Sequence, residues 1–242
     1  MKIEFFGTSH GVPSDIRYCN CIMLESEGHR YLFDVGAPAA DLMTRKGYPF
    51  SSLKAVFVTH LHGDHIGGLP NLLDLSNWYY RDSAYQVLLP EERGVTLLRQ
   101  YVKTTAATPL REALVLSAFE AGEIYRDEHI TVRAVEVAHS PDVKSFGFLV
   151  ECEGKRVYFT GDMCHDLHDF PAFLYESEVD LLITELAHFP TSLLFEKLVQ
   201  CKAKRICLNH VYPVSKIDEA LARRAELTGE LFAACDNDII VL

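Results

Sequence analysis

Three histidines and one aspartate fall within six consecutive residues of this 242-residue chain, at His60, His62, Asp64 and His65. Imidazole nitrogen and carboxylate oxygen are the ligands that borderline divalent ions prefer, Zn²⁺ first, with Mn²⁺ and Fe²⁺ as alternatives. A solvated histidine-rich loop is the other interpretation. Four ligand-forming side chains in so short a segment favour a metal site instead.

The residues around this cluster predict how it is presented. The apolar run at residues 55–59 is typical of a buried strand, and the apolar spacing from Gly67 onward predicts a helix. Because alternate residues at a strand end point to the same side, we expect His60 and His62 to face one metal. Gly63 should let the backbone turn tightly, so that the two ligands after it reach a second metal.

Three further candidate ligands stand where predicted strands end: His139, Asp162 and His210. Each alone is a weak signal, because a polar residue at a strand end is commonplace. Together they add one carboxylate and two imidazoles, which completes a set of seven candidate ligands for a two-metal site.

Predicted strands and helices are interspersed along the chain, which predicts a layered α/β protein. The predicted strands cover residues 2–7, 21–24, 31–35, 55–59, 86–89, 113–118, 130–138, 146–151, 155–160, 181–185, 205–208 and 239–242. The predicted helices cover residues 39–46, the stretch from residue 67, 91–103, 192–201 and 216–227. No composition shift marks a linker, so we expect one domain over residues 1–242.

The motif His-x-His-x-Asp-His and the three later ligands, in this order, resemble the metallo-β-lactamase-fold superfamily. The resemblance covers essentially the whole chain and implies a four-layer αββα sandwich with a dinuclear metal site at one edge. It also implies a division of the ligands. The first metal would be held by His60, His62 and His139, and the second by Asp64, His65 and His210, with Asp162 bridging the two.

Other segments resemble the ribonuclease Z and phosphodiesterase branch of that superfamily. They are FFGTSHGVP at residues 5–13, FDVG at residues 33–36, Leu-Pro at residues 69–70, and SFGF at residues 145–148 after His139. Two departures argue against tRNA 3′-end maturation, though not against phosphodiester chemistry. The chain has no basic, Gly/Pro-rich insertion that would grip tRNA, and Val211-Tyr212-Pro213 replaces a Ser-Arg-Tyr-like segment.

We therefore expect a dinuclear metal-dependent hydrolase, closest to a phosphodiesterase, in which a metal-bridging hydroxide attacks the substrate. Asp64 could also orient the attacking water. A leaving alkoxide needs a proton, and His188 is the first choice of donor, with Glu185 as the other candidate. The alternative for His188 is that it only lines the pocket or packs structurally.

Two more residues are candidates for supporting roles. Asp34 ends a predicted strand and could accept the second ring N–H of a ligating histidine, which fixes imidazole orientation. His10, in the loop after the first strand, could contact substrate, but an exposed loop position is the favoured interpretation.

The composition limits the partners. The chain has 23 basic and 34 acidic residues, a formal net charge of −11, which argues against large nucleic acids. Two divalent ions would still make the site locally positive, so we expect a small anionic phosphodiester as substrate. We expect a homodimer by default.

The same sequence bears on location. It has no apolar run long enough to cross a membrane, and its opening residues lack the pattern of a signal peptide. Seven cysteines without a disulfide-like spacing predict a reducing compartment, the cytoplasm.

Three other functions remain open. One is a thioester or lactone hydrolase that uses the same metals, and another is a tRNA 3′-processing endonuclease. The third is a non-catalytic sensor that keeps the fold, although the complete ligand set disfavours it.

Overall fold

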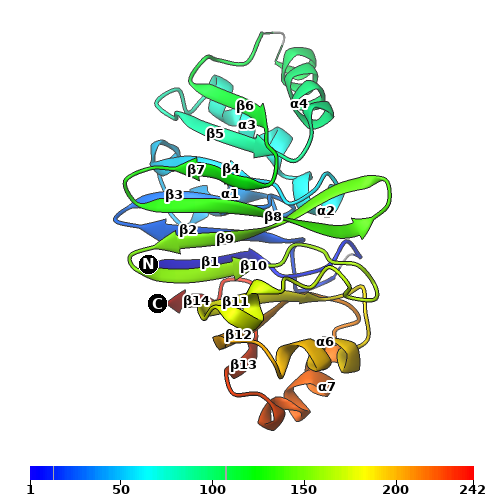
Figure 1. The fold of residues 1–242 in the computed structure, drawn as a ribbon. Helices are drawn as coiled ribbons and strands as arrows, with labels where there is room; N and C mark the ends of the chain where they lie inside the picture. Colours follow the sequence, from blue (N-terminus) through cyan, green and yellow to red (C-terminus); the bar gives the residue numbers. More distant parts are fainter. Residues whose placement is uncertain (13, 107) are drawn as a thin grey trace.

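Two seven-stranded β-sheets lie face to face, and helices cover the outer face of each (Figure 1). The computed structural model describes residues 1–12, 14–106 and 108–242. Pro13, the last residue of the ribonuclease Z-like segment 5–13, lies outside the described residues. The arrangement is the αββα sandwich that the resemblance implied.

The first sheet has the strand order β14-β1-β2-β3-β4-β5-β6. Its strands are β1 (Lys2–Gly7), β2 (Cys21–Ser26), β3 (His29–Phe33), β4 (Leu53–Phe57), β5 (Tyr85–Leu89), β6 (Leu114–Ala118) and β14 (Ile239–Val241). Pairing of β1 with β14 brings the two chain ends side by side (Figure 1). Strands β3 to β6 are parallel, so their carboxyl ends meet at one edge.

Helices α1 (Ala39–Arg45), α3 (Leu69–Trp78) and α4 (Glu92–Thr105) pack on the outer face of this sheet. In α4 the buried residues Val95, Leu98 and Val102 recur at spacings of three and four, the pattern of an amphipathic helix. The short helix α2 (Gly63–Ile66) belongs to the histidine-rich segment, and a 3₁₀ turn, η1, covers Phe50–Ser52.

The second sheet has the order β13-β12-β11-β10-β9-β8-β7. Its strands are β7 (Gly122–Arg126), β8 (Ile130–Ser140), β9 (Val143–Cys152), β10 (Lys155–Phe159), β11 (Val179–Leu186), β12 (Ala203–Val211) and β13 (Glu230–Ala233). Its outer face is covered by α5 (Phe173–Glu176), α6 (Thr191–Leu198) and α7 (Lys216–Ala222), which is followed by the 3₁₀ turn η2 (Arg224–Glu226).

Aromatic side chains fill the space between the sheets. Phe33 of the first sheet stacks on Phe159 of the second, with ring centroids 4.3 Å apart, and Phe57 and Phe148 pack against the ring of Phe33. Such buried rings contribute a large share of the apolar burial in a core. They hold the two sheets together directly beneath the residues that follow β3, β4 and β10.

The differences from the predicted elements have local causes. Strand β7 was not predicted because its edge position leaves it without a buried alternating face, and β13 is only four residues long. Strand β4 ends at Phe57, earlier than expected, whereas β8 and β12 continue through His139 and His210. Two of the candidate ligands therefore lie within strands rather than after them.

The backbone of the histidine-rich segment is constrained by Gly36 rather than by Gly63. Gly63 begins α2 with a negative φ and has open space around it, so the expectation that its conformational freedom makes the turn is wrong. Gly36, far earlier in the chain, is the constrained position. A Cβ there would lie 1.8 Å from the carbonyl oxygen of Asp64.

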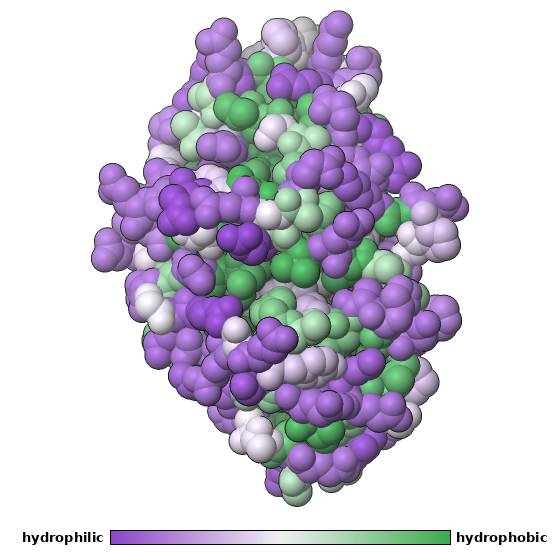
Figure 2. Space-filling model, in the orientation of Figure 1, coloured by the Kyte–Doolittle hydropathy of each residue, from purple (hydrophilic) through white to green (hydrophobic). Residues whose placement is uncertain are grey.

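The surface seen in Figure 2 is mostly hydrophilic, with hydrophobic residues visible between the polar ones near its middle. Among the described residues, no helix combines the length and the apolar character needed to cross a membrane.

Replacement of Gly36 by alanine should displace the backbone at Asp64 and lower the free energy of unfolding by about 1–3 kcal/mol, the usual cost of overpacking. Gly63→Ala is the matched control and should melt at or above the temperature of the unmodified protein, because alanine favours a helix. Thermal unfolding of both variants measures the difference. Equal melting temperatures would show that the contact between Gly36 and Asp64 does not constrain the site.

Candidate metal centre

All seven predicted ligands meet at one end of the sandwich, although they come from both sheets. His60 and His62 follow β4, Asp64 and His65 lie in α2, His139 lies in β8, Asp162 follows β10, and His210 lies in β12. Six of the side chains form two groups of three, and the seventh, a carboxylate, lies between the two groups.

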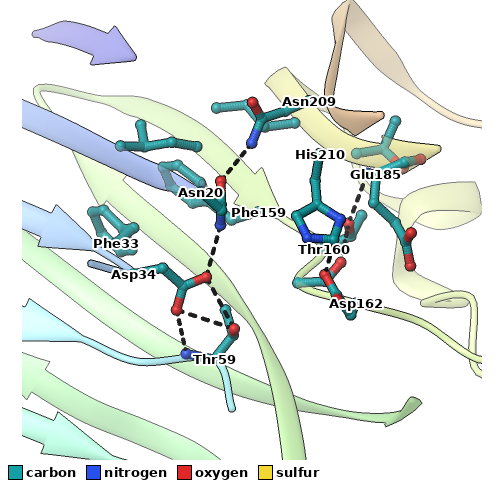
Figure 3. Close-up of a pocket in the computed structure, with 14 residues that line it drawn as sticks. Asn20, Phe33, Asp34, Thr59, Phe159, Thr160, Asp162, Glu185, Asn209 and His210 are labelled. Carbon is teal, nitrogen blue, oxygen red and sulfur yellow. Dashed lines mark hydrogen bonds and ion pairs between the residues drawn. The ribbon is translucent and has the colours of Figure 1, made fainter. Parts of the chain in front are cut away.

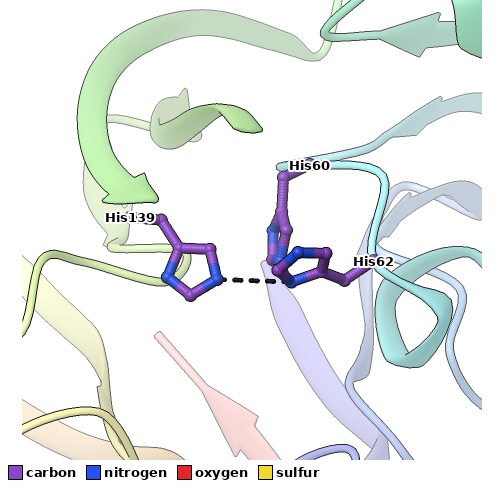
Figure 4. Close-up of side chains that lie close together, drawn as sticks. All are labelled: His60, His62 and His139. Atoms are coloured by element: carbon purple, nitrogen blue, oxygen red, sulfur yellow. Dashed lines mark hydrogen bonds between the residues drawn. The ribbon is translucent and has the colours of Figure 1, made fainter. Parts of the chain in front are cut away.

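The first trio is His60, His62 and His139 (Figure 4). His60 Nε2 lies 3.0 Å from His62 Nδ1, and His139 Nε2 lies 3.3 Å from the same atom. His60 is buried, whereas His62 is exposed, so the trio opens toward solvent on the His62 side. Three ring nitrogens thus converge, as ligands of one cation do.

The second trio is Asp64, His65 and His210. His210 Nε2 lies 3.2 Å from both Asp64 Oδ2 and His65 Nε2, and Asp64 Oδ2 lies 3.6 Å from His65 Nε2. Burial opposes ionisation of Asp64, but the hydrogen bond from His210 and the charge of His65 outweigh it and hold the pKa of Asp64 well below its usual range.

Asp162 lies between the trios. Its Oδ2 is 3.7 Å from His60 Nε2, 3.4 Å from His65 Nε2 and 3.9 Å from His139 Nε2, and its Oδ1 is 3.5 Å from His210 Nδ1. Burial would raise the pKa of this carboxyl, but the surrounding imidazoles hold it well below the ordinary value. One buried carboxylate therefore contacts members of both trios.

The donor set fits a divalent cation. Ring nitrogens and carboxylate oxygens face one another at short distances. There are too few protons among these imidazoles to form a hydrogen bond between every facing pair. Burial and the neighbouring histidines lower the pKa of His60, which keeps that ring neutral and ready to ligate. In the second trio, His210 Nε2 and His65 Nε2 face each other at 3.2 Å. A cation would satisfy these lone pairs.

Asp34 holds one of these rings in place, as the sequence suggested. Its Oδ2 lies 2.7 Å from His65 Nδ1 and accepts a 2.8 Å hydrogen bond from Asn20, while Oδ1 accepts the backbone N–H of Thr59 (Figure 3). Burial opposes protonation of His65, but Asp162 and Asp34 outweigh it and raise the pKa of His65 well above the usual value. Nε2 of His65 is thereby directed to the centre.

Glu185 and His188 form a second supported pair. Glu185 is buried, and its carboxylate accepts the backbone N–H groups of Met163, Ala187 and His188 and lies 2.7 Å from His188 Nδ1. His188 Nε2 faces Asp162 Oδ2 at 3.8 Å. Burial lowers the pKa of His188, but the hydrogen bond to Glu185 and its charge raise it above the ordinary value.

His10 also reaches the centre. Its ring lies 5.1 Å from that of His210 and 5.5 Å from that of His188, measured between centroids, and the side chain is half-buried. The favoured expectation of an exposed loop residue is therefore wrong. Burial, followed by the charges of His210 and His188, lowers the pKa of His10.

Sequence reasoning missed three residues that position the site. Asn209 donates to Asn20, which donates to Asp34, so a chain of hydrogen bonds links β12 to the loop after β3 (Figure 3). Lys216 donates to the backbone carbonyls of Ala187 and Phe189 and so fixes the segment that carries His188. The position of Asn209 beside His210 was the only available signal, and Asn20 and Lys216 carried none.

Comparison with known proteins identifies the family. Residues 1–198 match the family described as anti-Pycsar protein Apyc1. The chain belongs to this family. The match covers all the candidate ligands except His210.

Other proteins are similar to this Apyc1-family chain. Ribonuclease Z of Natronomonas pharaonis is 35% identical over 156 residues, which cover 64% of this chain and 49% of that protein. The chain spans about half the length of the curated relatives that it matches.

The fold recurs in solved structures. The short form of human tRNase Z has a TM-score of 0.75 at 22% identity and covers 100% of this chain and 99% of its own. The metallo-β-lactamase fold protein YhfI from Bacillus subtilis has a TM-score of 0.77 at 18% identity, with 99% of each chain covered. At these identities the likeness shows the fold, and the fold is the metallo-β-lactamase fold.

Proposed function

We propose that this protein is a dinuclear metal-dependent phosphodiesterase. The observation that carries the proposal is the position of the Asp162 carboxylate between two trios of ligand atoms, the arrangement that two neighbouring divalent ions need. His60, His62 and His139 would hold one ion, and Asp64, His65 and His210 the other. The donor atoms are nitrogens and oxygens only. Such a set suits Zn²⁺, and Mn²⁺ or Fe²⁺ would also fit.

When bound, such ions supply an activated water as nucleophile and neutralise charge that develops on the substrate oxygens. The residues of the chain do the rest. Asp64 is the more accessible of the two carboxylates in the ligand set, with its side chain 17% exposed against 3% for Asp162, so it can accept a hydrogen bond from the attacking water.

The proton for the leaving group comes from His188 in this proposal. Glu185 has its carboxylate turned to three backbone N–H groups and to His188 Nδ1, so it orients the imidazole rather than reaching the substrate. His188 Nε2 faces the centre and can donate a proton to a leaving oxygen there. This divides the two candidates: His188 donates, and Glu185 positions His188.

The chemistry of the substrate is a phosphodiester. Similarity to proteins named ribonuclease Z favours phosphorus over a carbonyl carbon as the point of attack. The same names count against the expectation that large nucleic acids are excluded, because a ribonuclease acts on RNA. A net charge of −11 describes the whole surface, whereas binding depends on the field at the site, so RNA belongs among the substrates to be tested.

A hydrolysis panel on zinc- and manganese-loaded protein tests the function. The substrates are bis(p-nitrophenyl) phosphate, a cyclic nucleotide, a precursor tRNA, a thioester and a lactone. We expect turnover of phosphodiesters, with no turnover of the carbonyl compounds. Activity on the thioester or the lactone alone would contradict the proposal.

Two variants show whether the measured activity belongs to this protein or to a contaminating enzyme. Asp162→Ala should lose activity, whereas Asp166→Ala, which removes an exposed aspartate four residues on, should keep it.

Replacement of His188 by alanine should slow turnover in a way that depends on the leaving group. Hydrolysis of a dinucleotide expels an alkoxide that needs a proton, so kcat for this substrate should fall about 10²–10⁴-fold. Hydrolysis of bis(p-nitrophenyl) phosphate expels p-nitrophenolate, which needs no proton, so kcat for that substrate should fall far less. Glu185→Gln should show a smaller loss with the same dependence. An equal loss on both substrates, at unchanged zinc content, would reject His188 as the proton donor.

A further inference from the structure

The loop between β1 and β2 carries His10 to the side of the metal centre where His188 and His210 lie. The His10 ring lies against those of His188 and His210, with centroids 5.5 Å and 5.1 Å away. On another side it stacks on Tyr212, at 5.2 Å between centroids and 22° between planes. His10 is not among the groups of side chains that converge closely enough to hold a metal in the described part of the chain.

Hydrogen bonds anchor the backbone of this loop next to His10. Ser9 N donates to Tyr18 O at 2.8 Å across the base of the loop, and His210 N donates to Thr8 O at 3.1 Å. Arg17 donates to the Thr8 hydroxyl and to a backbone carbonyl after β13, which ties the loop to the second sheet. His10 therefore starts from an anchored backbone.

The loop also lies directly over a candidate ligand. A Cβ on Gly11 would meet Asp64 Oδ2 at 3.0 Å, so the backbone next to His10 is as close to this carboxylate as packing allows. A substrate group held at the metals would consequently lie within reach of a side chain at position 10.

The hydrogen bonding of His10 leaves one nitrogen available. The backbone N–H of Val12 donates to His10 Nδ1 at 3.2 Å, so Nδ1 is the acceptor and the ring proton of the neutral imidazole lies on Nε2. Nε2 makes no hydrogen bond to residues 1–12, 14–106 or 108–242. Tyr212, which stacks on the ring, limits its rotation.

We propose that His10 is a substrate-binding residue whose Nε2–H donates a hydrogen bond to an anionic phosphoryl oxygen at the metal centre, and that Tyr212 is a positioning residue that holds this ring in place. The proposal rests on the proposed function, since it needs a phosphoryl group at the centre. It adds a protein donor to the side of the centre where His188 and His210 lie.

The test measures binding of inorganic phosphate to zinc-loaded protein by calorimetry, with no turnover involved. His10→Phe keeps a ring against Tyr212 but has no donor, and should weaken phosphate binding about tenfold, as expected for a hydrogen bond to a charged group. His10→Gln restores an N–H and should recover most of the affinity. Zinc content should stay equal to that of the unmodified protein.

His129→Phe is the matched control. His129 also stacks on a histidine, but it precedes β8, whereas His139 lies near the other end of that long strand, so phosphate affinity should not change. Tyr212→Ala should weaken phosphate binding in part, and Tyr212→Phe, which keeps the stacked ring, should not.

Three results would overturn the proposal: unchanged phosphate affinity in His10→Phe, loss of zinc from that variant, or no recovery in His10→Gln. Failure of the proposed function looks different. In that case zinc-loaded protein would bind phosphate through His10 but hydrolyse no phosphodiester. If phosphodiesters are hydrolysed, the KM for bis(p-nitrophenyl) phosphate should rise more in His10→Phe than kcat falls.

Discussion

The structure depends on one electrostatic constraint: a buried carboxylate is surrounded by imidazoles whose lone pairs point toward it and toward one another. Asp162 Oδ2 lies within 4 Å of ring nitrogens of His60, His65, His139 and His188. Buried polar atoms without partners are costly, so such a cluster is stable only when protons or cations lie between its members. A divalent ion in each trio would bring two positive charges to these lone pairs.

The backbone meets this constraint at a local cost. Asp34 and His210 both have positive φ, 56° and 50°, a conformation that ordinary residues adopt at a cost of about 1 kcal/mol or more. Both are held there by neighbours. Asp34 accepts hydrogen bonds from Thr59 and Asn20, and the backbone N–H of His210 donates to Thr8 O. With this backbone conformation the Asp34 carboxylate contacts His65 Nδ1, and the His210 ring joins the second trio.

The same constraint explains why the site joins the two sheets. One trio has members from the segment after β4 and from β8, and the other from α2 and β12. The chain of hydrogen bonds Asn209–Asn20–Asp34 crosses between the sheets beside the candidate ligand His65. The stacked rings of Phe33 and Phe159 lie next to the residues that begin this crossing. Packing between the sheets therefore fixes the distances on which metal binding depends.

The sequence was sufficient to single out the seven candidate ligands that the structure brings together, because side chains of the right types stand beside strands in a recognisable order. It also placed Asp34 beside a histidine of the cluster, because this strand was expected to end near the candidate ligands, and Asp34 Oδ2 lies 2.7 Å from His65 Nδ1. It failed for Asn20, Asn209 and Lys216, whose roles arise only from tertiary contacts between distant segments. It misjudged Gly63 for the same reason: the required glycine is Gly36, and only the folded chain shows the close approach to Asp64.

Crystals of the zinc-loaded protein would show whether Asp162 bridges two metal ions. Anomalous diffraction at the zinc edge should show two peaks per chain about 3.5–4 Å apart, both in contact with the Asp162 carboxylate. One ion should lie among His60, His62 and His139, and the other among Asp64, His65 and His210. A single peak at saturating zinc, or two peaks of which only one contacts Asp162, would show that Asp162 does not bridge two ions.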